Sequence, residues 1–76
     1  MLEEKKEERI LKGEVTNCER LNVRKKPDIE GAVKCIINNS DIVKIYEDKS
    51  TDEWYKVNTK DGVYGYCMKK YISVLP

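Results

Sequence analysis

The sequence predicts an all-β domain, a small barrel of five or six short strands. From Gly13 onward, β-branched and aromatic residues alternate with polar ones, and turn-forming clusters interrupt them at short intervals. An alternation with period two is typical of strands that bury one face. The chain has 76 residues, which is enough for one domain with a modest core. Closing a small sheet into a barrel removes its exposed edges, so this architecture suits a chain of such length.

The first dozen residues differ from the rest of the chain. Residues 3–9 form a block of seven charges, in which like charges recur at a spacing of four: Glu3 with Glu7, Glu4 with Glu8, and Lys5 with Arg9. These pairs are repulsive on a helix, and the segment is shorter than the ~12–15 residues an isolated helix needs. We therefore expect residues 1–12 to be a mobile tail or interdomain linker, and residues 13–76 to be the folded domain.

The first half of the domain contains three expected extended segments. Residues 14–18 are predicted as the first strand and residues 21–23 as a short extended piece that enters a polar loop over residues 24–31. Pro27 cannot donate a ladder hydrogen bond, so this loop should lie outside the regular sheet. In residues 33–37, Val33, Cys35 and Ile37 share one face. The Asn-Asn-Ser-Asp run at 38–41 is turn chemistry.

The second half contains the strongest local signal. Residues 42–46 are predicted as a strand with Val43 and Ile45 directed inward. Residues 54–58 and 63–68 should form a hairpin, because Asp61-Gly62 lies between two alternating apolar runs. Tyr71 and Ile72 then precede a last short strand over residues 73–75.

Composition excludes several classes of function. The chain carries 15 basic and 14 acidic residues, so it lacks the basic excess of a duplex-binding module, and no nucleic-acid partner is expected. Its longest uncharged run, the seven residues 62–68, is far short of the ~20 apolar residues of a membrane span. No secretory signal follows Met1. The protein is therefore either cytosolic or a piece of a longer chain, and its location stays open.

The sequence offers no catalytic or metal-binding set. Histidine is absent, so Cys18, Cys35 and Cys67 lack their usual base. These cysteines form no close-spaced pair of the kind that binds zinc. We expect no enzyme activity, no metal and no cofactor. The three thiols are expected to be reduced, with Cys35 and Cys67 buried as small apolar residues, although a disulfide between two of the three cysteines stays open.

A series of short motifs resembles the bacterial Src-homology-3 (SH3) domain. It begins with Leu-Asn-Val-Arg at residues 21–24 and Pro27, and continues with Trp-Tyr-Lys-Val at 54–57, Gly-x2-Gly-Tyr at 62–66 and Tyr-Ile at 71–72. The resemblance covers residues 13–74, nearly the whole chain. The departures are conservative: Ser40 stands where a turn glycine is usual, Tyr66 replaces a tryptophan, and Cys67 replaces a valine. The resemblance implies a small SH3-like barrel.

The resemblance also implies a function. Such domains are non-catalytic binding modules, which often target an attached cell-wall hydrolase or phage lysin to peptidoglycan by binding a peptide stem or cross-bridge. The alternative is an intracellular protein-interaction module or a structural spacer, whose partner would be another protein. We expect a monomer in either case.

The expected binding groove combines matched polar residues with aromatic ones. Tyrosine and tryptophan keep one polar end and are favoured at interfaces, and arginine suits carboxylates and carbonyls. The candidate ligand-binding residues are Asn22, Arg24, Trp54, Tyr64, Tyr66 and Tyr71. For Asn22 and Arg24 a structural bond to the loop is an open alternative, and for each aromatic residue the alternative is simple cover of the barrel.

Overall fold

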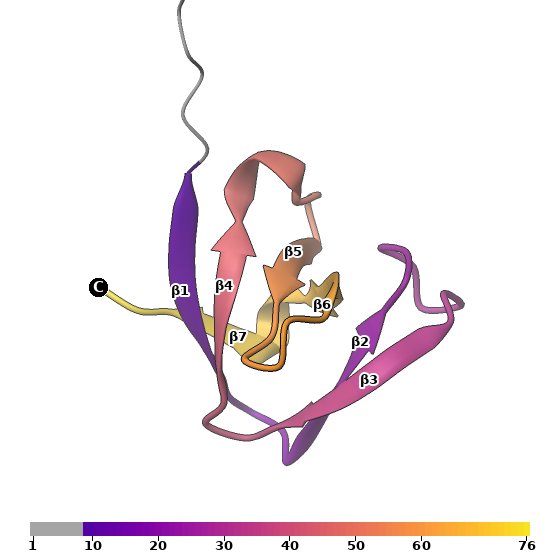
Figure 1. Cartoon of the computed structure of the whole chain (residues 1–76), viewed down its shortest axis with the longest axis horizontal. Helices are drawn as coiled ribbons and strands as arrows, with labels where there is room; N and C mark the ends of the chain where they lie inside the picture. Colours follow the sequence, from indigo (N-terminus) through magenta and orange to yellow (C-terminus); the bar gives the residue numbers. More distant parts are fainter. Residues whose placement is uncertain (1–8) are drawn as a thin grey trace, which may run out of the picture.

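The computed structural model describes residues 9–76, which form one antiparallel sheet of seven strands (Figure 1). The strands are β1 (Ile10–Val15), β2 (Arg20–Arg24), β3 (Val33–Asn38), β4 (Ile42–Tyr46), β5 (Trp54–Asn58), β6 (Tyr64–Met68) and β7 (Ile72–Val74). Two short 3-10 turns connect strands that follow each other in the sequence: η1 (Glu47–Lys49) joins β4 to β5, and η2 (Lys69–Tyr71) joins β6 to β7. The all-β prediction is confirmed, with more strands than the five or six expected.

The sheet is curled into a barrel that stays open along one line. Its strand order is β3-β2-β6-β5-β4-β1-β7, so β3 and β7 are the two end strands. Figure 1 shows the β2–β3 hairpin turned away from the β1–β4 pair, with β5 and β6 between them. The two end strands therefore each keep one side without a partner strand within residues 9–76. In the same residues, no helix is long and apolar enough to cross a membrane.

The first strand lies earlier in the chain than the predicted residues 14–18. β1 pairs with β4 from Ile10 opposite Tyr46 to Glu14 opposite Ile42, and the strand ends before Asn17, which has a φ of +61°. Gly13 lies inside this strand, where a Cβ would lie only 2.6 Å from Ile72 Cγ2. The position therefore favours a residue without a side chain. Residues 10–12, expected as the end of the tail, are therefore part of the sheet. The predicted mobility of residues 1–8 lies outside the described residues.

The turn between β3 and β4 uses a serine in a conformation that favours glycine. Ser40 has a φ of +74°. The Asp41 carboxylate accepts a hydrogen bond from the Asn38 backbone N–H at 2.8 Å, and the Asp41 N–H donates to the Asn38 carbonyl at 3.0 Å. These bonds hold Ser40 in the left-handed region, at the position where the family pattern has a turn glycine.

The predicted β5–β6 hairpin is confirmed. Its register runs from Trp54 opposite Met68 to Asn58 opposite Tyr64, and Gly62 takes a φ of +87° in the turn. Thr59 is buried at the base of this turn, where its hydroxyl accepts a hydrogen bond from the Val63 N–H at 3.1 Å.

Gly65 allows β6 to approach β2 closely. A Cβ at this position would lie 2.5 Å from Val23 Cγ1 and 2.8 Å from the Arg24 carbonyl oxygen. A glycine inside a strand often marks a close approach of another backbone, and Gly65 is such a position.

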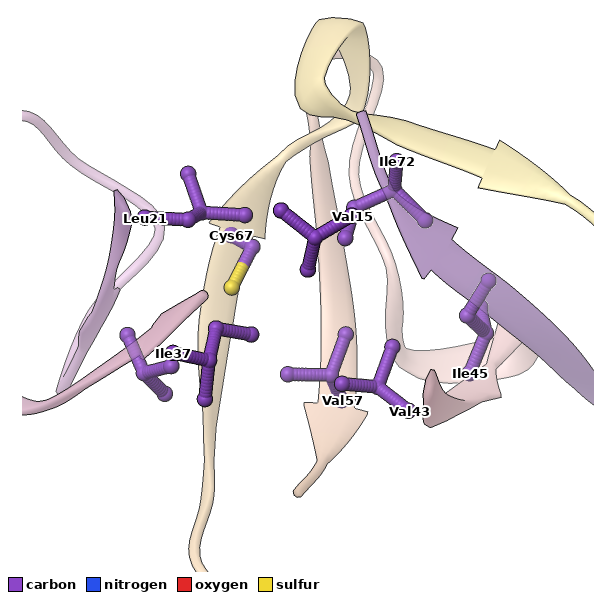
Figure 2. Packing of buried hydrophobic residues seen from close by; sticks show 9 residues of the cluster. Val15, Leu21, Ile37, Val43, Ile45, Val57, Cys67 and Ile72 are labelled. Carbon is purple, nitrogen blue, oxygen red and sulfur yellow. The ribbon is translucent and has the colours of Figure 1, made fainter. Parts of the chain in front are cut away.

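Every strand contributes to a single core. Figure 2 shows the labelled side chains directed toward one another in the shared interior. The core members are Val15, Leu21, Val23, Ile37, Val43, Ile45, Val57, Cys67 and Ile72. Val43 and Ile45 point inward as predicted, at 2% and 0% exposed.

The three cysteines have free thiols, as expected. Cys67 is fully buried, but Cys35 is only half-buried, so the prediction for Cys35 was wrong. Burial on this face of β3 decreases from Ile37 through Cys35 to Val33, which is 46% exposed, because the β2–β3 hairpin extends away from the core toward its loop (Figure 1).

Candidate functional site

A hollow of about 280 Å³ lies between β2, the loop that follows it, and the ends of β5 and β6. Four of the six predicted ligand-binding residues line it: Asn22, Arg24, Trp54 and Tyr71. The other lining residues are Cys18, Arg20, Leu21, Ile29 and Met68. We call these nine residues together the arginine–tryptophan pocket.

The polar wall of this pocket comes from one face of β2. Leu21 and Val23 are buried in the core, so the alternate residues Arg20, Asn22 and Arg24 face the other way. Arg20 and Asn22 are exposed, and Arg24 is half-buried. The alternation of a strand therefore places two guanidinium groups and one amide in a row along the pocket.

Arg24 is bound to the loop. Its Nη1 donates a hydrogen bond to the Gly31 carbonyl oxygen at 2.8 Å. Gly31 is itself buried, and a Cβ there would lie 3.0 Å from the Lys26 carbonyl oxygen. The Arg24 contact fixes the loop that brings Ile29, 65% exposed, to the rim of the pocket. The structural role that the sequence left open for Arg24 is thus present in the fold.

The aromatic wall comes from Trp54 and Tyr71. Trp54 is 8% exposed but lies outside the core cluster, opposite Met68 on the outer face of the β5–β6 hairpin. Its backbone N–H donates to the Thr51 hydroxyl oxygen at 3.2 Å, which fixes the start of β5. Tyr71, in η2, packs against the core, and its carbonyl oxygen accepts a hydrogen bond from the Thr16 N–H at 2.9 Å. Both rings are therefore held by the fold.

Tyr64 and Tyr66 do not line this pocket. They continue along the outer face of β6, beyond Met68. The Lys56 ammonium lies 4.8 Å from the centre of the Tyr66 ring. The Tyr64 ring lies 5.7 Å from that of Tyr46, in a tilted arrangement. The structure therefore brings four of the predicted residues together and places these two on a neighbouring patch of lysine and tyrosine.

Sequence reasoning missed Arg20, Ile29, Met68 and Cys18. Arg20 could have been found, because it has the same parity as Asn22 and Arg24 in a strand of alternating burial. Met68 has the same parity as Tyr64 and Tyr66 in β6. The contribution of Ile29 depends on how the loop folds back, and the sequence pattern carries no signal for this.

The lining of the pocket is basic and partly apolar. None of its nine lining residues is acidic, and two are arginines. Burial raises the pKa of the Cys18 thiol above its ordinary value, so the thiol stays protonated at neutral pH. Within residues 9–76, no group of three or more His, Cys, Asp or Glu side chains is arranged to hold a metal ion. The pocket can donate hydrogen bonds to a ligand, bind a negatively charged group and cover the apolar parts of the ligand.

A comparison with models of protein families finds a match over most of the domain. The model of the bacterial SH3 domain matches residues 19–73, a span that runs from β2 into β7. It contains every lining residue of the arginine–tryptophan pocket except Cys18. No curated protein matches the chain.

Proposed function

The chain belongs to the bacterial SH3 domain family, a family of non-catalytic binding modules, and we propose that it binds a peptide of the bacterial cell wall. In this proposal the domain targets an attached wall hydrolase or lysin to peptidoglycan. The peptide would be a stem or a cross-bridge of the wall polymer, and it would occupy the arginine–tryptophan pocket.

The observation that supports this proposal is that one pocket combines hydrogen-bonding side chains from β2 with the packed rings of Trp54 and Tyr71. An extended peptide presents backbone amides at regular intervals along its length. The Asn22 side chain can both donate to and accept from such an amide. Trp54 offers an apolar edge to a peptide side chain, because its ring is packed in place outside the core cluster and is 8% exposed.

The pocket is shallow, which sets the expected strength of binding. A hollow of about 280 Å³ is near the lower limit of small-molecule sites, so an isolated copy should bind weakly. Attachment to a hydrolase that also engages the wall would raise retention without any new contact, through the effective concentration of the second site.

The test is an NMR titration of the isotopically labelled protein with soluble wall fragments. We expect the shift changes to concentrate on Asn22, Arg24, Trp54 and Tyr71, with no hydrolysis of the fragments. Asn22→Ala should weaken binding several-fold, because it removes the amide that would bind the peptide. It should leave the fold intact, because the exposed Asn22 side chain makes no hydrogen bond within residues 9–76.

Tyr64→Ala is the matched control, since Tyr64 is also exposed but lies outside the pocket. It should leave the affinity unchanged. If wall fragments of several peptide chemistries cause no shift changes at millimolar concentration, the wall-peptide proposal fails. An intracellular protein-interaction or spacer role would then take its place.

A further inference from the structure

We infer that the arginine–tryptophan pocket recognises a carboxylate of its ligand, and that Arg20 makes this contact. In the same scheme Arg24 is a positioning residue that holds the loop. This inference rests on the proposed function, because it specifies which group of the bound peptide is recognised. The pocket contains two arginines, and their surroundings show that they have different roles.

Arg24 is already engaged within the fold. It is half-buried, and its Nη1 donates to the Gly31 carbonyl oxygen at 2.8 Å. A guanidinium is planar and rigid, so one short hydrogen bond at one end restricts where its other donors can point. Using Arg24 to grip a ligand would compete with the contact that fixes the loop.

The Arg20 side chain is not engaged in this way. It is exposed, and it makes no hydrogen bond or salt bridge with any other residue in the range 9–76. It lies on the same face of β2 as Asn22, two residues away, which corresponds to roughly 6–7 Å along a strand. All five of its N–H donors are therefore available beside an amide that can orient a peptide.

The charge of the pocket favours an anionic ligand group. None of the lining residues is acidic, so nothing in the pocket wall neutralises Arg20. The anionic groups that a peptide can offer are its C-terminal and side-chain carboxylates. A carboxylate matches the fork of a guanidinium with two parallel hydrogen bonds, which are stronger than bonds to a neutral amide.

The geometry also orders the ligand along the pocket. A carboxylate at Arg20 would lie next to a peptide amide at Asn22, and the side chains of the peptide would then reach Trp54. A free carboxylate beside an amide is what the end of a peptide chain presents. An acidic side chain can present the same pair, and the test separates the two.

The test compares three forms of one synthetic wall-stem peptide that contains an acidic residue. One form has all carboxylates free, one has an amidated C-terminus, and one has an amidated acidic side chain. We expect the wild-type protein to bind the free form roughly three- to tenfold more tightly than one of the amidated forms, as measured by NMR titration at low salt. The form that loses affinity identifies the recognised carboxylate, and the difference should shrink at high salt.

The two arginines are then separated by substitution. In Arg20→Gln the preference for the free carboxylate should disappear, while Arg20→Lys should retain part of it. Arg24→Gln should weaken all three peptides by a similar factor and shift the Gly31 amide resonance, but the preference should remain. Arg24→Lys should restore affinity, because its ammonium can still donate to the Gly31 carbonyl.

The failures of the two proposals are distinguishable. If the wild-type protein binds all three peptides equally, or if Arg20→Gln keeps the preference, the carboxylate inference is overturned and wall-peptide binding stands. If the preference is lost in Arg24→Gln instead, the roles of the two arginines are reversed and the assignment to Arg20 is wrong. If none of the peptides binds and no other wall fragment does, the proposed function fails, and the inference fails with it.

Discussion

Alkaline pH should destabilise this domain through one buried thiol. Cys67 is fully buried in the core, and its Sγ–H donates a weak hydrogen bond to the Asn22 carbonyl oxygen at 3.6 Å. Burial raises the pKa of the Cys67 thiol from its ordinary value of 9.0 to about 12, with smaller contributions from Cys35 and Cys18. The folded state therefore keeps the proton of Cys67 over a pH range in which the unfolded chain loses it.

The sign and size of the effect follow from proton linkage. Above pH 9 the unfolded state binds fewer protons at this site than the folded state, so the free energy of unfolding falls as the pH rises. The slope is about 1.4 kcal/mol per pH unit between the two pKa values. By pH 11 the loss amounts to roughly 2 to 3 kcal/mol. This is a large part of the roughly 4–11 kcal/mol expected for a domain of 76 residues.

The assay is urea unfolding from pH 8 to pH 11, carried out on the wild type and on Cys67→Ala. Lysine and tyrosine titrate in both proteins, so the difference between the two free energies isolates Cys67. The alanine variant should start out less stable at pH 8, because the missing sulfur leaves a small void. The gap should close as the pH rises, and the variant should become the more stable protein if the pKa is as high as 12. A constant gap across this range would refute the burial of an intact thiol in the core.

Three further predictions concern packing and turns. Gly65→Ala should lower the free energy of unfolding by roughly 1–3 kcal/mol, as measured by urea unfolding, because its Cβ would meet a backbone carbonyl oxygen at 2.8 Å; an unchanged midpoint would mean that the two strands are not in close contact. Ser40→Gly should hold or raise the melting temperature, since it relieves a φ of +74°, and a clear decrease would show that the serine hydroxyl matters more. Val43→Ala should cost about 2 kcal/mol of stability with little change in ligand affinity per folded molecule, whereas the half-buried Tyr66→Ala should cost less; equal losses in thermal melts would place Tyr66 in the core.

Local sequence signals were sufficient for much of the fold. The Asp61-Gly62 hairpin formed as predicted because its turn conformation is encoded in two residues, one of them with a positive φ. The inward direction of Val43 and Ile45 followed from simple alternation. The residues of the Leu-Asn-Val-Arg motif likewise took the alternating positions of a strand, with Leu21 and Val23 in the core.

The features that sequence reasoning missed depend on contacts between distant segments. Gly13 looked like the boundary of the first strand, but it lies inside β1, where Ile72 from the other end of the chain leaves no space for a side chain. The sequence cannot show that contact, because it joins residues almost sixty positions apart. The expected mobile tail was therefore drawn three residues too long.

The candidate site shows the same limit. Strand parity correctly placed Tyr64 and Tyr66 on one face of β6, but parity does not say which neighbours a curled sheet brings to each position. In the curled sheet Tyr66 lies beside Lys56, and Tyr64 lies beside Tyr46. The pocket is lined instead by Trp54, Tyr71 and side chains of β2. Arg20 became a candidate ligand-binding residue only from the structure, in which it lines the pocket beside Asn22 and its side chain makes no hydrogen bond or salt bridge within residues 9–76.

Trp54 gives the domain a built-in optical reporter. It is the one tryptophan of the chain, and it is 8% exposed in the wall of the pocket. Indole emission moves to longer wavelength when the ring enters water. The red shift of Trp54 emission should therefore report the global unfolding of the domain. A ligand in the pocket should instead change the intensity with little shift in wavelength, because the ring is already largely shielded. Emission from a single residue can therefore separate occupancy from unfolding in one unlabelled sample.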